Sequence, residues 1–390
     1  MLLDFSPISE ELSATQRATA KRRFHRIVNH FLPASEIDND DGNNNDDDDG
    51  DDDDSDSARI GVGSKTYSPP RLISLTYKYA LSDRARDNFL RAFFQSIGVP
   101  VAREDGTDGD PETFRPSVFD FADYLLQHFF YPLKAEGKKT PQPSPVFRSA
   151  IDRVQAGHSF AGTPERLSAL RGACLIRDHH RCVISHRFDR TEALARMRKD
   201  GERRALDDDG NLLSRERRAA PLEVAHIIPH SLMTVAANSE LSPSKQAALA
   251  ILNMFDTGVV HEIEGSNIDR PRNALTLTQE NHDAFGRFEI FFEHVADYTY
   301  RIDTLEPRYL FEDLPVTRTL HLSENRTIDP PSPRLLAVHR AIAHILHLSA
   351  AGEYIDKLLR DIEGQGVCAA DGSTEIGRLL QFGLRGFISI

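Results

Sequence analysis

The pattern between Leu222 and Gly286 limits the fold of this chain more than any other feature of its sequence. It opens with Leu-Glu-Val-Ala-His, in which apolar residues alternate with others up to His226, and Pro229 follows soon after. This alternation is typical of a short strand. From Asn273 onward leucine alternates with threonine, which predicts a second strand. The segment therefore predicts two strands that are far apart in the sequence.

A short helix is predicted directly after the second strand. Thr278 is a good N-cap residue, and Glu280 suits the positive end of the helix dipole. The helix is expected to carry His282 in its first turns and to end at Gly286, in the C′ position that favours glycine. The elements thus follow the order strand, strand, helix, with a histidine on the first strand, an asparagine opening the second and a histidine on the helix.

This order, and the spacing from Asn273 to His282, resemble the HNH endonucleases of the ββα-metal superfamily. The segment Cys174–Asp189 is also similar to the region that precedes the motif in fungal HNH nuclease domain-containing proteins. The resemblance covers about residues 164–300. It implies an α+β fold with a ββα-metal core, and an enzyme that hydrolyses phosphodiester bonds of nucleic acid with a single divalent metal ion.

Phosphodiester hydrolysis near neutral pH needs a base that activates water and a cation that stabilises negative charge. Histidine suits the first task because its ordinary pKa is about 6.5, and a divalent ion suits the second as a Lewis acid. By the resemblance, His226 is the general base, Asn273 braces the loop and orients the base, and His282 is a metal ligand. The expected ion is Mg, Mn, Zn or Ni, and the expected partner is nucleic acid, DNA in the first place.

Two positions depart from the pattern of the family. Ala225 stands where a metal ligand commonly precedes the base, and Gly286 stands where many members have another ligand one helical turn after the helix histidine. Residues nearby that could replace these ligands are Glu223, His230, Asp283 and Glu289. The departures leave an alternative open, in which a catalytically inactive HNH fold binds nucleic acid or protein. In that alternative, phenylalanine-rich helices at 82–98 and 118–130 form the contact surface. A second alternative is a helix-mediated interaction protein in which the core is only a scaffold.

The charge of the chain is concentrated in one tract. Twelve aspartates and no lysine or arginine lie between Asp38 and Asp56, so the rest of the chain carries a net charge of only -1 against -13 for the whole. Between Pro164 and His230 fourteen basic residues stand against eleven acidic ones, and all but one of the bases are arginine. This arginine-rich segment is compatible with phosphate contacts.

The sequence predicts five regions. They are an amphipathic N-terminal helix at 1–36, a disordered acidic linker at 37–66, a helical region at 67–150, the HNH nuclease-like domain at 163–325 and a C-terminal helical region at 326–390. Within the domain we expect a helix starting at Thr163, an exposed charged insertion at 190–218, a helix at 242–255, a loop at 259–272 and a β-hairpin at 287–303.

The number of cysteines and the lengths of the apolar segments indicate the cellular compartment. Three cysteines in a chain of 390 residues do not form a disulfide framework, and no signal peptide or membrane-spanning run is visible. We therefore expect an intracellular protein, nuclear or cytoplasmic, without a membrane partner. Cys174 and Cys182 lack paired zinc-ligand spacing and are expected in the core, and His344 and His347 are expected to be ordinary helix residues.

Overall fold

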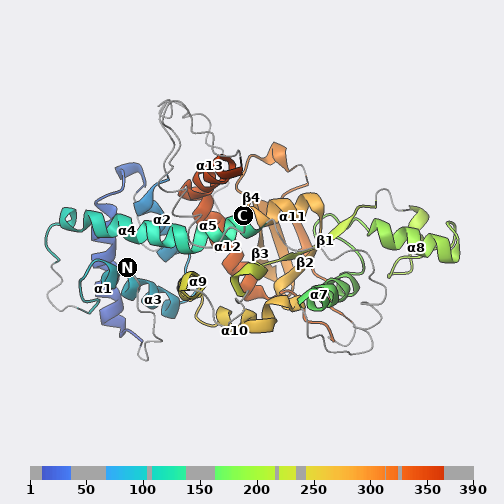
Figure 1. The fold of residues 1–390 in the computed structure, drawn as a ribbon, viewed down its shortest axis with the longest axis horizontal. Coiled ribbons are helices and arrows are strands. Elements are labelled where there is room, and N and C mark those ends of the chain that lie inside the picture. Colours follow the sequence, from blue (N-terminus) through green and yellow to red (C-terminus); the bar gives the residue numbers. More distant parts are fainter. Residues whose placement is uncertain are drawn as a thin grey trace.

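The computed structural model describes residues 11–36, 67–102, 108–137, 163–215, 219–233, 243–311, 313–323 and 327–363. The predicted acidic linker at 37–66 lies outside these ranges. The protein is α+β, with helices around two small antiparallel sheets (Figure 1). Within the described ranges, one sheet has two strands and the other has three.

Helices make up the N-terminal part of the structure. They are α1 (Ala14–Asn29), α2 (Pro69–Lys78), α3 (Asp83–Ser96), α4 (Arg115–Leu125), a π-helical turn (Leu126–Phe130) and α5 (Tyr131–Gly137). Local sequence explains where they begin: the side chain of Ser13 accepts a hydrogen bond from the backbone of Gln16 in a capping box, and Ser82 caps α3. These helices confirm the helical interpretation of this region.

Six of the seven phenylalanines of α3 and of the 118–130 segment are buried, and Phe119 is partly buried. Phe89, Phe93, Phe94, Phe121, Phe129 and Phe130 are all no more than 2% exposed. The prediction that these helices offer an aromatic contact surface is therefore wrong. The rings join one apolar cluster that extends from α1 to α13.

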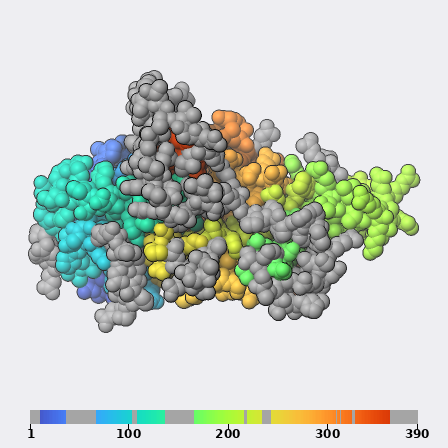
Figure 2. Space-filling view, viewed as in Figure 1, coloured from blue at the N-terminus to red at the C-terminus, as the bar shows by residue number. Residues whose placement is uncertain are grey.

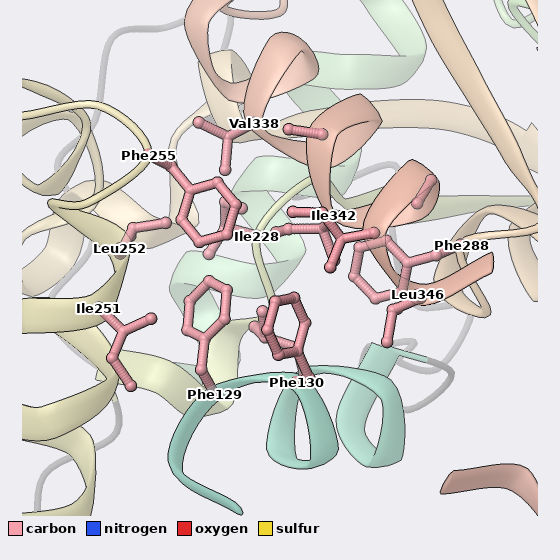
Figure 3. Packing of buried hydrophobic residues seen from close by; sticks show 14 of the residues in the cluster. Phe129, Phe130, Ile228, Ile251, Leu252, Phe255, Phe288, Val338, Ile342 and Leu346 are labelled. Carbon is pink, nitrogen blue, oxygen red and sulfur yellow. The ribbon is translucent and has the colours of Figure 1, made fainter. Parts of the chain in front are cut away.

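Figure 3 shows how this cluster reaches the second half of the chain. Phe129 stacks on Phe255 with ring centroids 5.2 Å apart. Ile228 lies among side chains from α9 (Pro243–Leu252) and α12 (Pro333–Leu348). Ile228 follows β1 by two residues. The apolar core thus fixes the chain immediately after the first predicted strand.

The β1–β2 hairpin and α11 appear as predicted. Strands β1 (Leu222–His226) and β2 (Ala274–Thr278) pair in antiparallel register, with Glu223 opposite Leu277 and His226 opposite Ala274. Helix α11 (Gln279–Gly286) follows at once, and the hydroxyl of Thr278 accepts a hydrogen bond from the backbone of Asn281. Helix α7 (Thr163–Arg177) packs against both strands.

A second sheet follows α11. Strands β3 (Ile290–Ala296) and β4 (Thr299–Thr304) form the predicted hairpin, and β5 (Val316–Thr319) adds a third antiparallel strand. Helices α12 (Pro333–Leu348) and α13 (Ala351–Glu363) close the described chain, with α12 packed on β3. No single helix in the described ranges has the length and apolar composition of a membrane span; α12 and α13 meet these criteria only together, across an 82° bend.

The exposed charged insertion predicted at 190–218 contains helix α8 (Arg190–Asp200) and a small apolar core of its own. Two other local predictions are wrong. The loop predicted at 259–272 contains helix α10 (Val259–Ile263) and the 3₁₀ turns Gly265–Asp269 and Pro271–Asn273. Gly286 is the last residue of α11 and not a left-handed C′ residue; the left-handed conformation falls on Phe288, whose φ is 61°.

The cysteines and histidines considered above as possible metal ligands outside the motif have structural roles. Cys174 and Cys182 are free and buried, as expected. His344 is buried, and its Nδ1 lies 2.9 Å from the carbonyl oxygen of Arg340 in the preceding turn of α12. His347 lies 3.5 Å from a carboxylate oxygen of Glu306. Both are ordinary helix residues.

Candidate functional site

His226 ends β1 with its imidazole almost fully enclosed. Its side chain is 1% exposed, and its Nε2 lies 3.3 Å from Oδ1 of Asp269, in the 3₁₀ turn before β2. Its Nδ1 is buried and has no hydrogen-bond partner among the described residues. When Nε2–H donates to Asp269, the neutral ring keeps its lone pair on Nδ1. His226 therefore offers one basic nitrogen that the protein leaves open.

Asp269 is a residue that the sequence analysis missed. Its carboxylate is fully buried: Oδ1 also accepts a hydrogen bond from Nδ1 of His230 at 2.6 Å, and Oδ2 accepts one from Nε of Arg166 on α7 at 3.2 Å. Burial disfavours the charged form, but the hydrogen bonds from His226 and His230 outweigh it and hold the pKa of Asp269 below its usual range. Asp269 therefore stays ionised against the base.

The pKa of His226 reflects the same surroundings. Burial lowers it from its ordinary value of 6.5, and the hydrogen bond and negative charge of Asp269 oppose this effect. Positive charge on His230 or His282 lowers the pKa of His226 further. The net result is a histidine that is neutral at neutral pH, the form that a general base requires.

Asn273 is completely buried directly before β2, where its amide braces the chain that leaves β1. Its Oδ1 accepts a hydrogen bond from the backbone N–H of Ile228, and its Nδ2 donates to the carbonyls of Ile228 and Ile268, all at 2.9 Å. All of these partners are backbone groups, so the amide positions the loop after His226 and the turn that carries Asp269.

His282 lies in the second turn of α11 and faces β1. Its Nδ1 donates to Oε2 of Glu223 at 2.6 Å, and its side chain is 3% exposed. Its Nε2 is buried without a partner among the described residues. Metal-ligating histidines usually donate their second ring N–H to a carboxylate, which orients the ring and raises its basicity. The His282–Glu223 pair has this arrangement, and it fits a divalent ion at Nε2.

A second group could also hold a cation. Ligand atoms of His226, His230 and Asp269 all lie within 4.8 Å of one another. In this group, however, the oxygen of Asp269 that faces the imidazoles already accepts two hydrogen bonds, and its other oxygen pairs with Arg166. Nε2 of His282 has no hydrogen-bond partner among the described residues, so it is a second candidate ligand position for a metal ion.

Of the four replacement ligands considered from the sequence, two pair with residues of the site and, in the part of the chain that the structure describes, two do not. Glu223 touches His282 and His230 touches Asp269. Glu289 pairs instead with Arg287 at 2.9 Å, and no ion pair joins Asp283 to the site within the described chain. The sequence indicated Glu223 as a candidate because it lies on the same face of the strand as Ala225. No sequence pattern indicated Asp269, because only the fold of the 253–273 connection brings it to His226.

Comparison with known proteins identifies the segment that holds these residues. Residues 182–293 match the family model described as HNH endonuclease, and this span contains His226, Asn273 and His282. No match was found among curated proteins or among solved structures. The strands and the helix that carry the two unpartnered imidazole nitrogens thus lie wholly inside the segment that is similar to the HNH endonuclease family.

Proposed function

We propose that this protein is a metal-dependent endonuclease that hydrolyses phosphodiester bonds of nucleic acid, with DNA as its substrate. The observation that carries the proposal is the pairing of two buried imidazoles, each backed by a carboxylate and each with one unpartnered nitrogen. One ring is suited to accept a proton and the other to bind a cation. Hydrolysis of a phosphodiester needs both.

His226 takes the role of general base in this proposal. Its Nδ1 accepts a proton from water while the water oxygen forms a bond to phosphorus and the bond to the leaving oxygen breaks. Asp269, held ionised beside Nε2, stabilises the imidazolium that results. Asn273 holds the two segments that carry His226 and Asp269 in register.

His282 takes the role of metal ligand, with Glu223 fixing its ring. A bound divalent ion supplies Lewis acidity to the phosphate and the leaving oxygen. His282 is the one side chain whose unpartnered nitrogen we assign to the ion, and an ion held there would draw its other ligands from water or the phosphate. Mg, Mn, Zn and Ni are all candidates.

Nicking of supercoiled plasmid tests the proposal. Full-length protein is incubated with each of the four metals, beside His226→Ala, His282→Ala and the control His261→Ala, whose side chain is 81% exposed. We expect cleavage in the wild type and the control, and a loss of about 10²–10⁴-fold in His226→Ala. No cleavage with any metal, or equal cleavage in all variants, would contradict the proposal.

The alternative of a catalytically inactive fold makes a different prediction in the same experiment. It requires nucleic-acid binding without nicking, and no metal in the purified protein at stoichiometric level. Metal content, measured on the purified wild type and on His282→Ala, separates the two. The proposed enzyme retains metal in the first and loses it in the second.

A further inference from the structure

Residues 190–215 form an arm that stands out from the body of the protein. The arm consists of α8 and the segment that returns from it, and both Figure 1 and Figure 2 show it projecting beyond the β1–β2 hairpin. A small core of its own, made of Phe188, Ala193, Ala205 and Leu213, gives it a defined shape. It is therefore an ordered projection, with a large surface for its size.

The arm is fastened to the segment 179–181 by a series of pairs between acidic and basic residues. Three consecutive bases meet three consecutive aspartates in reverse order: His179–Asp209 at 2.8 Å, His180–Asp208 at 3.0 Å and Arg181–Asp207 at 2.7 Å. Arg196 of α8 adds a contact with Asp208 at 2.9 Å. These contacts occupy the aspartates of the arm on its inner side.

Several other basic side chains of the arm take no part in these pairs and are exposed. Arg198, Lys199 and Arg203 are exposed, and within the described ranges none of them has an acidic partner. Arg204 and Arg215 are exposed as well. Asp200 and Glu202 are the exposed acids of the arm that stay outside the aspartate pairs. Folding thus converts a segment of mixed charge into an outer surface with an excess of positive charge.

One aspartate joins the arm to the strand of the hydrolytic site. Asp189 caps α8, because its Oδ1 accepts a hydrogen bond from the backbone of Glu192 at 2.8 Å. Its Oδ2 accepts one from the backbone of Leu222 at 3.2 Å, at the first residue of β1. Glu223, which orients His282, is the next residue. The base of the arm is therefore held next to the site.

We propose that this arm binds the phosphate backbone of the nucleic acid beside the hydrolytic site. Arginine and lysine on an exposed projection suit phosphate oxygens, and such contacts position a duplex without reading its sequence. The binding surface is Arg198, Lys199 and Arg203. This inference rests on the proposed function, because it takes the partner of the arm to be the substrate.

Binding measured without catalysis tests the inference. Full-length His226→Ala protein in EDTA is titrated against a fluorescent DNA duplex at several salt concentrations, with and without Arg198→Ala, Lys199→Ala and Arg203→Ala together. Each phosphate contact adds about 0.9 to the slope of log affinity against log salt on B-DNA, so loss of three contacts should reduce the slope by roughly 2.7. Affinity should fall by a similar factor for duplexes of different sequence.

A control with the same change in net charge is Arg22→Ala, Arg84→Ala and Arg360→Ala, three exposed bases outside the 163–325 domain. It should leave the slope unchanged, and all variants should unfold at the same temperature. If the slope is the same for His226→Ala protein with and without the three arm substitutions, the inference is wrong. In that case the proposed function still stands, provided that the wild-type protein nicks plasmid DNA. A protein that neither binds nor nicks DNA fails the proposed function itself.

Discussion

Glu223 and His282 lie 59 positions apart in the sequence, yet Oε2 of one is 2.6 Å from Nδ1 of the other. The contact crosses from β1 to α11 and leaves Nε2 of His282 open. A carboxylate in this position fixes the tautomer of the ring and strengthens its remaining nitrogen as a ligand. Glu223 is therefore a positioning residue for the proposed metal site.

Glu223→Gln should weaken metal binding. Loss of the carboxylate leaves His282 less basic and less well oriented, and such changes typically cost 10- to 100-fold in metal affinity. Calorimetric titration of the protein with Mn or Zn measures the effect directly. Glu280→Gln, an exposed residue on the same helix, is the control, and unchanged affinity in both variants would contradict the assigned role.

The rate of cleavage should depend on the protonation of His226. Burial lowers its pKa below 6.5, so cleavage at saturating metal should rise with pH, with its midpoint below 6.5. Asp269 raises that pKa, so Asp269→Asn should move the midpoint to still lower pH while reducing the maximal rate. A pH–rate profile of both proteins measures this. A midpoint that moves to higher pH in the variant would argue against the pairing.

Asn273→Ala should destabilise the protein and reduce cleavage together. The substitution leaves buried backbone groups of Ile228 and Ile268 without their partner, at about 1–3 kcal/mol for each unsatisfied group. Urea unfolding gives the loss in free energy of unfolding. A variant as stable as the wild type would show that water replaces the amide.

The pair Arg177–Asp178 should be essential for stability. Both side chains are at most 1% exposed and lie 2.8 Å apart, and Arg177 also donates to the carbonyls of Pro271 and Ala274 around the start of β2. Asp178→Ala leaves a buried cation without its partner and should cost about 3–5 kcal/mol in urea unfolding. Asp209→Ala, whose side chain is 41% exposed, should cost at most about 1 kcal/mol.

His339 should make the protein less stable in acid. The ring is buried between Phe285 and Phe288, with centroid distances of 3.8 and 4.5 Å, and burial lowers its pKa to about 3. Below pH 6.5 the unfolded chain binds a proton that the folded ring does not, so stability falls as pH decreases until the folded pKa is reached. The loss from this residue is about 2 kcal/mol between pH 6.5 and pH 5.

Replacement by phenylalanine isolates this effect from the other histidines. His339→Phe keeps an aromatic ring in the stack and removes the titration. The difference in melting temperature between pH 7.5 and pH 5 should be smaller in this variant than in the wild type. His261→Ala, at an exposed position, should behave like the wild type, and an unchanged difference in His339→Phe would contradict the assignment.

Several elements followed from the sequence because neighbouring residues decide them. The alternation at 222–226 and the caps at Ser82 and Thr278 depend on side chains within a few positions, and all three predictions are confirmed. Helix α11 ends at Gly286 as predicted, but the C′ role predicted for this glycine is wrong. The left-handed residue is Phe288, not Gly286, and the ring of Phe288 stacks on His339 of the distant helix α12.

The sequence by itself determined which residues carry the candidate chemistry: His226, Asn273 and His282, in an order and spacing that few folds share. Only the tertiary structure decided which carboxylates contact the two histidines. Asp269 reaches His226 across 43 positions, and Glu223 reaches His282 across 59. Such contacts depend on how strands and helices pack around a common core, and packing is a property of the whole chain that no local pattern specifies.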